Sequence, residues 1–198
     1  MGTKGWLYGQ ACVYKVLFSA SHRLTIDSVA EREAGVHTLS FFPDIPISVD
    51  EFLVERNRVQ DTLWPTVPLL PGTRKLVNHL KKHNIPMAVA TSSRRKNFEK
   101  KSGHLQDLFG LFEGKIVCGD DKQYNMKGKP APDIFLTTAR VFLGRDVGDL
   151  ESVPTSIHLE ERRKGLVFED AIPGMQAGKR AGMSGMLVTF IFILFSTY

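Results

Sequence analysis

Cysteine is nearly absent from this sequence. Cys12 and Cys118 are the two in 198 residues, and they stand far apart without partners at metal-ligand spacing. Such a pair argues against a disulfide framework and indicates reduced thiols in a cytosolic protein. Long apolar runs are missing as well: the stretch 186–195 is nearly all apolar, but about ten residues are too few to cross a bilayer. We interpret 186–190 as a buried strand and expect a cytoplasmic protein with no membrane partner.

Basic residues are in modest excess over acidic ones, which gives a net charge of +5. The basic residues cluster at 81–82, 94–96, 100–101 and 162–164. Such clusters could follow a nucleic-acid backbone, so a basic nucleic-acid-binding module is one alternative function. No aromatic-stacking or groove-reading motif accompanies them, and we interpret them as solvated faces with no nucleic-acid partner. An anionic small molecule would also suit a mildly basic protein.

The middle of the chain alternates between short apolar runs and helical patterns. Ser48 and Glu51 form a capping box that starts a helix reaching about Leu63. Beyond it, the pattern predicts helices over 73–84, 94–101 (with Ser93 as a possible cap), 132–143 and 173–181, and strands over 86–90, 116–118, 166–168 and 186–190. Strands and helices at this spacing predict an α/β protein with a Rossmann-like parallel sheet and helices on both faces. Residues 19–43 lack a clean period, and 144–165 is predicted to be a long charged loop.

In open parallel sheets, active sites lie at the carboxyl ends of the strands. Three such places in this sequence carry polar side chains. Thr91 and Ser92 could donate to a phosphate, although a Ser/Thr group before a helix is more often a cap. Lys129, held between glycine and proline, suits a fixed positive charge aimed at a phosphoryl oxygen, but alone it reads as a surface lysine. Glu169 and Asp170 could hold a hard cation such as Mg²⁺, or simply favour a helix start.

Taken together, the order and context of the three motifs resemble the haloacid dehalogenase (HAD) superfamily of phosphatases. The motifs read Val-Ala-Thr-Ser-Ser-Arg at 89–94, Gly-Lys-Pro-Ala-Pro-Asp-Ile-Phe at 128–135 and Phe-Glu-Asp at 168–170. The residues of these motifs are most similar to those of the pseudouridine-5′-phosphatase group, which has a helical cap. The resemblance covers about residues 46–188. It implies that Thr91, Ser92 and Lys129 bind the phosphoryl group and that Thr91 and Lys129 act as catalytic residues, with Lys129 neutralising the phosphoryl charge. It also implies that Glu169 and Asp170 help to hold Mg²⁺.

The family's reaction also needs a first motif, Asp-x-Asp, whose first aspartate attacks phosphorus and whose second acts as general acid and base. The sequence has no such motif: Asp27 is followed two positions on by Val29, and Asp44 by Pro46. Residues 4–18 resemble a degraded first cap helix, so the nucleophile strand is expected to be missing. Backbone groups of the two flanking strands would then lack partners, at about 1–3 kcal/mol each. A truncated gene and a true pseudoenzyme both explain the gap.

These observations predict a partial helical cap over 1–67, with an insertion at about 19–43, and a HAD-like core over 68–198 that lacks its first strand. The resemblance implies a Mg²⁺-dependent phosphomonoesterase for a sugar phosphate or nucleotide-like monophosphate, with pseudouridine 5′-phosphate the nearest candidate. Without the nucleophile we expect this chain to be inactive and to bind Mg²⁺ weakly. The alternative is a pseudoenzyme that binds a small phosphorylated metabolite without hydrolysing it.

Overall fold

The computed structural model describes residues 11–14 and 29–188, and the side chains of 11–14, 29–31 and 34 lie outside the description. The strands are β1 (Ala11–Tyr14), β2 (Met87–Thr91), β3 (Ile116–Cys118), β4 (Gly165–Glu169) and β5 (Ser184–Leu187). The α-helices are α1 (Val29–Ser40), α2 (Val49–Leu63), α3 (Thr73–Lys82), α4 (Arg95–Ser102), α5 (Gln106–Phe109), α6 (Asp133–Leu143), α7 (Ser156–Arg163) and α8 (Ile172–Arg180). Among the described residues, no helix is long and apolar enough to cross a membrane.

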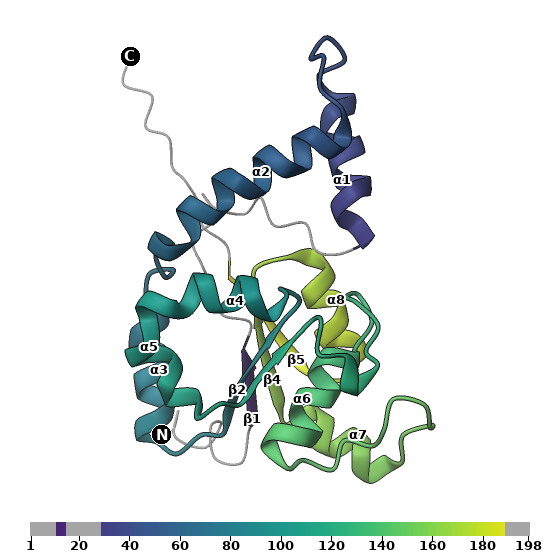
Figure 1. Cartoon of the computed structure of the whole chain (residues 1–198). Helices are drawn as coiled ribbons and strands as arrows, with labels where there is room; N and C mark the ends of the chain where they lie inside the picture. Colours follow the sequence, from purple (N-terminus) through teal and green to yellow (C-terminus); the bar gives the residue numbers. More distant parts are fainter. Residues whose placement is uncertain (1–10, 15–28, 189–198) are drawn as a thin grey trace, which may run out of the picture.

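The five strands form one parallel sheet in the order β3-β2-β1-β4-β5, which confirms the predicted α/β class. Helices α3, α4 and α5 lie on one side of the sheet and α6 and α8 on the other, while α1 and α2 stand apart as a helical pair (Figure 1). Helix α2 begins with the predicted capping box, in which the Ser48 hydroxyl accepts from the Glu51 N–H and the Glu51 carboxylate accepts from the Ser48 N–H. The division of the chain into cap and core stays a prediction.

Strand β1 corrects the expectation that the core lacks its first strand. Residues 11–14 pair with β2 on one side and with β4 on the other, so that Tyr14 is in register with Val89 and with Phe168. The reading of 4–18 as a cap helix is therefore wrong for 11–14. The short Ala-Cys-Val-Tyr segment gives the backbone donors and acceptors of both flanking strands their partners, and it removes the cost expected for an open gap in the sheet.

Two further segments differ from expectation. The region predicted as a loop over 144–165 contains α7, which Thr155 caps: its hydroxyl accepts from the His158 N–H at 3.3 Å. The signal for this helix was a Thr-x-x-His capping pair, in place of the more familiar Glu or Gln at the last position. The unpatterned region 19–43 contains α1, whose apolar residues follow no single face of the helix.

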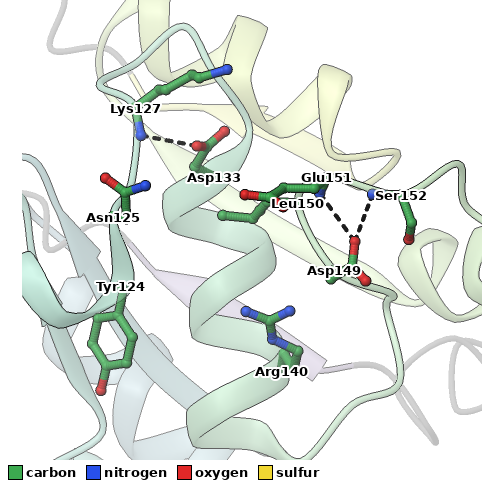
Figure 2. A pocket seen from close by; sticks show the side chains of 9 residues that line it. All are labelled: Tyr124, Asn125, Lys127, Asp133, Arg140, Asp149, Leu150, Glu151 and Ser152. Carbon is green, nitrogen blue, oxygen red and sulfur yellow. Dashed lines mark hydrogen bonds between the residues drawn. The ribbon is translucent and has the colours of Figure 1, made fainter.

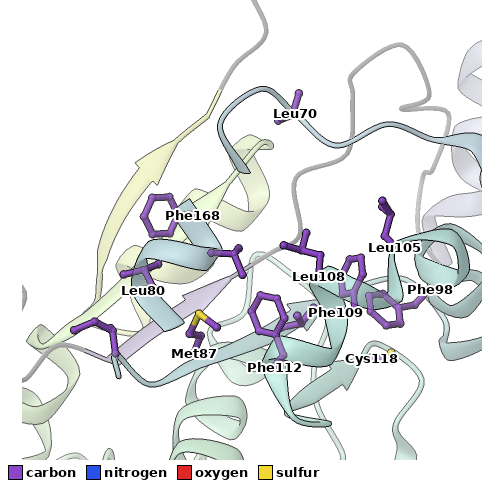
Figure 3. Packing of buried hydrophobic residues seen from close by; sticks show 13 residues of the cluster. Leu70, Leu80, Met87, Phe98, Leu105, Leu108, Phe109, Phe112, Cys118 and Phe168 are labelled. Carbon is purple, nitrogen blue, oxygen red and sulfur yellow. The ribbon is translucent and has the colours of Figure 1, made fainter. Parts of the chain in front are cut away.

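The side chains of β2 and β4 alternate between two cores, one on each face of the sheet, as expected for strands buried on both faces. The side chains of β5 are exposed, so the expectation of a buried strand at this place in the sequence is wrong. Met87, Val89 and Phe168 pack on one side with the phenylalanines of α4, α5 and the turns beside them (Figure 3). Ala90 and Val167 pack on the other side with α6 and α8. This double burial fixes the strands in place, and with them the residues that follow each strand.

Candidate functional site

The carboxyl ends of β2 and β4 bring two of the predicted site residues to one rim of the sheet. Val89 and Phe168 are level with each other across Tyr14, and Thr91 and Asp170 each lie two residues further along. Two strand spacings separate them, which is about 10 Å. Thr91 is 6% exposed and Asp170 is half-buried. The two residues therefore lie at the same rim of the sheet, on either side of β1.

Lys129 reaches the same rim from the loop that precedes α6. Its ammonium donates to the carboxylate of Glu169, the last residue of β4, and the two side chains are 6% and 0% exposed. The ammonium also lies 4.7 Å from the centre of the Phe135 ring, a favourable cation–π distance. The structure therefore places Lys129 beside Glu169 and its neighbour Asp170, and the surface-lysine interpretation does not hold.

A close approach by α8 holds the Glu169 carboxylate where it is. A Cβ atom on Gly174 would lie 2.0 Å from Cδ of Glu169, so no larger residue fits at this position in the first turn of the helix. The second oxygen of Glu169 accepts from the Asp170 N–H at 3.3 Å. The glycine thus lets the buried carboxylate sit against the start of α8, where the helix dipole favours negative charge.

The turn Thr91-Ser92-Ser93 is built from its own hydrogen bonds. The Ser93 N–H donates to the Thr91 hydroxyl at 3.2 Å, and the Ser93 carbonyl accepts from the Gly119 N–H at 3.1 Å. A Cβ on Gly119 would lie 2.4 Å from the Ser92 carbonyl oxygen, so this position requires glycine. The turn at the end of β2 and the turn at the end of β3 therefore support one another.

Ser93 is not the cap of α4. The helix begins after Arg94, and the Asp120 carboxylate accepts from the Arg95 N–H at 2.8 Å. The neighbouring Asp121 accepts from the Arg95 guanidinium and from the Cys118 N–H, and this ion pair raises the pKa of Arg95. The Gly-Asp-Asp segment at 119–121 thus anchors α4 to β3. The sequence showed the two acids, but their shared partner Arg95 lies about 25 residues away and had no local signal.

The predicted magnesium ligands fit a metal only in part. Glu169 is completely buried and engaged by Lys129, which leaves Asp170 as the half-buried carboxylate of the pair. Within the described ranges 11–14 and 29–188, no group of three or more His, Cys, Asp or Glu side chains could hold a metal ion. A magnesium ion prefers six oxygen ligands. As they stand, these residues do not make a complete site.

A pocket of about 590 Å³ lies elsewhere, along the outer side of α6 (Figure 2). Asp133 and Arg140 of α6 face it, and its two walls are formed by Tyr124, Asn125 and Lys127 on one side and by residues 149–152 on the other. The Asp133 carboxylate accepts from the Lys127 N–H at 2.9 Å, which ties one wall to the helix. None of the predicted site residues lines this pocket, so its position does not mark the rim described above.

The prediction that the nucleophile is missing concerns the residues that follow β1. Thr91 and Asp170 are two positions beyond the residues level with Tyr14, and the residue two positions beyond Tyr14 in the sequence is Val16. Lys15, Val16 and Leu17 carry no carboxylate. These three residues and Asp27 lie outside the described residues, so the absence of the nucleophile stays a prediction.

Comparison with known proteins identifies relatives for most of the chain. Residues 33–182 match the haloacid dehalogenase-like hydrolase family. The chain is 38% identical over 142 residues to (DL)-glycerol-3-phosphatase 2 of Arabidopsis thaliana, covering 72% of this chain and 53% of that protein. It is 34% identical over 161 residues to a Saccharomyces cerevisiae protein named "Probable pseudouridine-5′-phosphatase", covering 81% of this chain and 63% of that protein. The chain therefore spans about half to three fifths of these relatives.

Solved structures share the fold. A HAD hydrolase of Entamoeba histolytica, described as family IA, variant 3, superposes with a TM-score of 0.59 at 25% identity, covering 89% of this chain and 82% of that one. CbbY from Rhodobacter sphaeroides, solved in complex with phosphate, gives a TM-score of 0.55 at 18% identity over 95% of this chain and 89% of that one. The second likeness concerns the fold alone.

Proposed function

This chain belongs to the haloacid dehalogenase-like hydrolase family, and from that premise we propose that it binds the phosphoryl group of a small phosphorylated metabolite at the rim formed by Thr91, Lys129 and Asp170. One observation carries the proposal: Lys129, forty residues from Glu169 in sequence, pairs with it at the carboxyl end of β4. That end is level with Thr91 across β1. A cation and a hydroxyl at one rim of a parallel sheet suit a phosphate.

Each residue has a distinct role in this proposal. Lys129 supplies positive charge from a buried position, where it acts more strongly than it would in water. Thr91 and Ser92 contribute hydroxyl or backbone donors at the end of β2. Asp170, with Glu169 behind it, would contribute to a magnesium ion, which would neutralise further phosphoryl charge. Because Glu169 is engaged by Lys129, we expect Mg²⁺ to bind weakly, in the millimolar range or above.

The substrate class follows from the relatives and from the resemblance of the motifs. Glycerol-3-phosphatase and the protein named for pseudouridine-5′-phosphatase both take their names from small phosphomonoesters. We infer a sugar phosphate or a nucleotide-like monophosphate, with pseudouridine 5′-phosphate the first to try. The cytoplasm, where such metabolites are held, is the compartment we expect.

Hydrolysis is a separate question from binding. The family's reaction requires an aspartate nucleophile, and no Asp-x-Asp occurs in the printed sequence. Loss of a nucleophile that acts together with its partners lowers the rate by several orders of magnitude. We therefore propose that this chain binds phosphomonoesters and turns them over negligibly.

Titration calorimetry with inorganic phosphate, and then with pseudouridine 5′-phosphate, tests the binding proposal. Thr91→Val should weaken binding about tenfold or more, because a donor to the phosphoryl group is lost. Lys127→Met, which removes an exposed lysine outside the proposed site, is the control and should leave binding within about twofold. No measurable phosphate binding by the unaltered chain would refute the proposal.

A turnover assay with Mg²⁺ distinguishes the binding protein from the enzyme. We expect no release of phosphate above the rate seen without protein. Turnover that disappears in Asp170→Asn would show that a nucleophile is present and that our account of the gap is wrong. Calorimetry that gives micromolar Mg²⁺ affinity would show that a further ligand exists, with Asp27 the first residue to substitute.

A further inference from the structure

Lys101 of α4 is a buried cation that connects two regions of the protein. The residue is 6% exposed, and its ammonium donates to the Ser93 hydroxyl at 3.2 Å. The same ammonium lies 4.9 Å from the centre of the Trp64 ring. Ser93 belongs to the turn at the end of β2, and Trp64 belongs to the segment Trp64–Val67 that joins α2 to the core. One side chain thus touches both.

The segment Trp64–Val67 is held against the helix that carries Lys101. Trp64 is 3% exposed, and Lys100 lies 5.8 Å from the same ring while pairing with Asp61 of α2 at 2.6 Å. The His104 ring nitrogen is 3.0 Å from the Val67 carbonyl oxygen. Figure 1 shows α4 between the end of α2 and the sheet. The segment that follows α2 therefore packs directly on α4.

Through its other contact, Lys101 binds Ser93 in the turn 91–93. Ser93 donates its N–H to the Thr91 hydroxyl, accepts from the Gly119 N–H through its carbonyl, and accepts from Lys101 through its own hydroxyl. These three bonds fix both the direction of the Thr91 hydroxyl and the path of the backbone at 91–93. A fixed ammonium behind the turn also adds positive potential where the proposed phosphate would bind.

We propose that Lys101 is a positioning residue that fixes the turn 91–93 for phosphate and couples it, through Trp64, to the segment that carries the helical pair. The effect on phosphate binding rests on the proposed function. The effect on the turn itself does not, and it can be measured in the protein without ligand.

Four variants separate charge from packing. Lys101→Met removes the ammonium and keeps an unbranched side chain over Trp64, whereas Lys101→Arg keeps the charge. Lys100→Met is the matched control, because it removes the neighbouring cation over the same ring and leaves the Ser93 bond intact. Trp64→Phe weakens the cation–π contact while keeping an aromatic ring in the buried position.

The first measurement is amide NMR of the ligand-free protein at a temperature well below unfolding. Lys101→Met should shift the Ser93 and Gly119 amide signals and raise their hydrogen exchange about tenfold, because the hydroxyl of Ser93 loses a charge-assisted bond. Lys100→Met should leave both amides unchanged, and Lys101→Arg should restore most of the protection. Unchanged Ser93 and Gly119 amides in Lys101→Met would overturn the proposal.

The second measurement is the dissociation constant for inorganic phosphate. We expect about tenfold weaker binding in Lys101→Met, less than about twofold in Lys100→Met, and recovery to within about threefold in Lys101→Arg. Trp64→Phe should weaken binding in the unaltered background but not in the Lys101→Met background, since coupled residues give non-additive effects. Additive effects would refute the coupling through Trp64.

The two measurements also distinguish the two proposals. If the amides respond to Lys101→Met but the unaltered protein binds no phosphate, the proposed function fails and the positioning role stands. If phosphate binds the unaltered protein and Lys101→Met equally well, the proposed function stands and the role of Lys101 in binding is refuted. A purely structural role would lower the melting temperature of Lys101→Met without changing the phosphate affinity of the folded protein.

Discussion

Replacing Lys129 with methionine removes a cation from beside a carboxylate that has no contact with solvent. Glu169 is 0% exposed, and the position of Gly174 prevents its carboxylate from moving toward α8. Removing one partner of a buried ion pair costs about 3–5 kcal/mol, because the remaining charge keeps its desolvation penalty. For a chain of this size that is a fall in melting temperature of roughly 6–20 °C. Typical total stability is about 5–15 kcal/mol, so Lys129→Met would lose a large share of it.

The double variant Lys129→Met/Glu169→Gln decides whether the buried charge is the cause. Removing both charges together should restore at least about 2 kcal/mol relative to Lys129→Met alone, which a double-mutant cycle measures as a coupling energy. Lys127→Met, an exposed lysine two residues earlier, should change stability by less than about 0.5 kcal/mol. Urea unfolding supplies the four free energies. A cost below about 1 kcal/mol for Lys129→Met, or strict additivity in the double variant, would refute the reasoning.

Three further predictions use other parts of the structure. Gly119→Ala should destabilise the protein by about 1–3 kcal/mol in urea unfolding, because its Cβ would lie 2.4 Å from a backbone carbonyl oxygen; a neutral effect would contradict the packing. Burial raises the pKa of Cys118 to about 12, so at pH 8 about one thiol in ten thousand is ionised, and peptide mapping should show alkylation of Cys118 only after denaturation. Lys115 and Lys81 lower the pKa of Glu113 from 4.5 to about 2, so its stabilisation is full above pH 4.5 and is lost as the pH falls toward 2. The small stability difference between the unaltered chain and Glu113→Gln should close over that range and shrink in high salt.

Much of the fold could be predicted because its signals are local. The helix at 49–63 carries its own capping box, and the short apolar runs that became β2, β3 and β4 are flanked by turn residues. The parallel sheet could be predicted as well, since strands that alternate with helices at this spacing typically form one. The candidate site followed from the rule that the carboxyl ends of such strands share one rim.

What the sequence did not reveal depends on contacts between distant residues. The pairing of Lys129 with Glu169 joins positions forty residues apart, and no local pattern distinguishes a buried ion pair from a metal ligand. The cap of α4 comes from Asp120, so that the nearby Ser93 is left to bind Lys101. A polar residue before a helix has several possible partners, and only the packing of β3 against α4 selects among them.

Strand β1 shows how separate the demands of folding and of catalysis are. A central strand needs a few residues that tolerate burial and have backbone groups in register, and the segment at 11–14 meets that need by pairing with both β2 and β4. The family's chemistry needs something more specific, a carboxylate at the end of that strand, and the sequence there continues with Lys15, Val16 and Leu17. We therefore expect a sheet that is complete in a chain that does not carry out the reaction. Thr91 and Lys129 take their positions from the sheet and from their contacts with Ser93 and Glu169, which do not involve that carboxylate, and we therefore expect phosphate binding without hydrolysis.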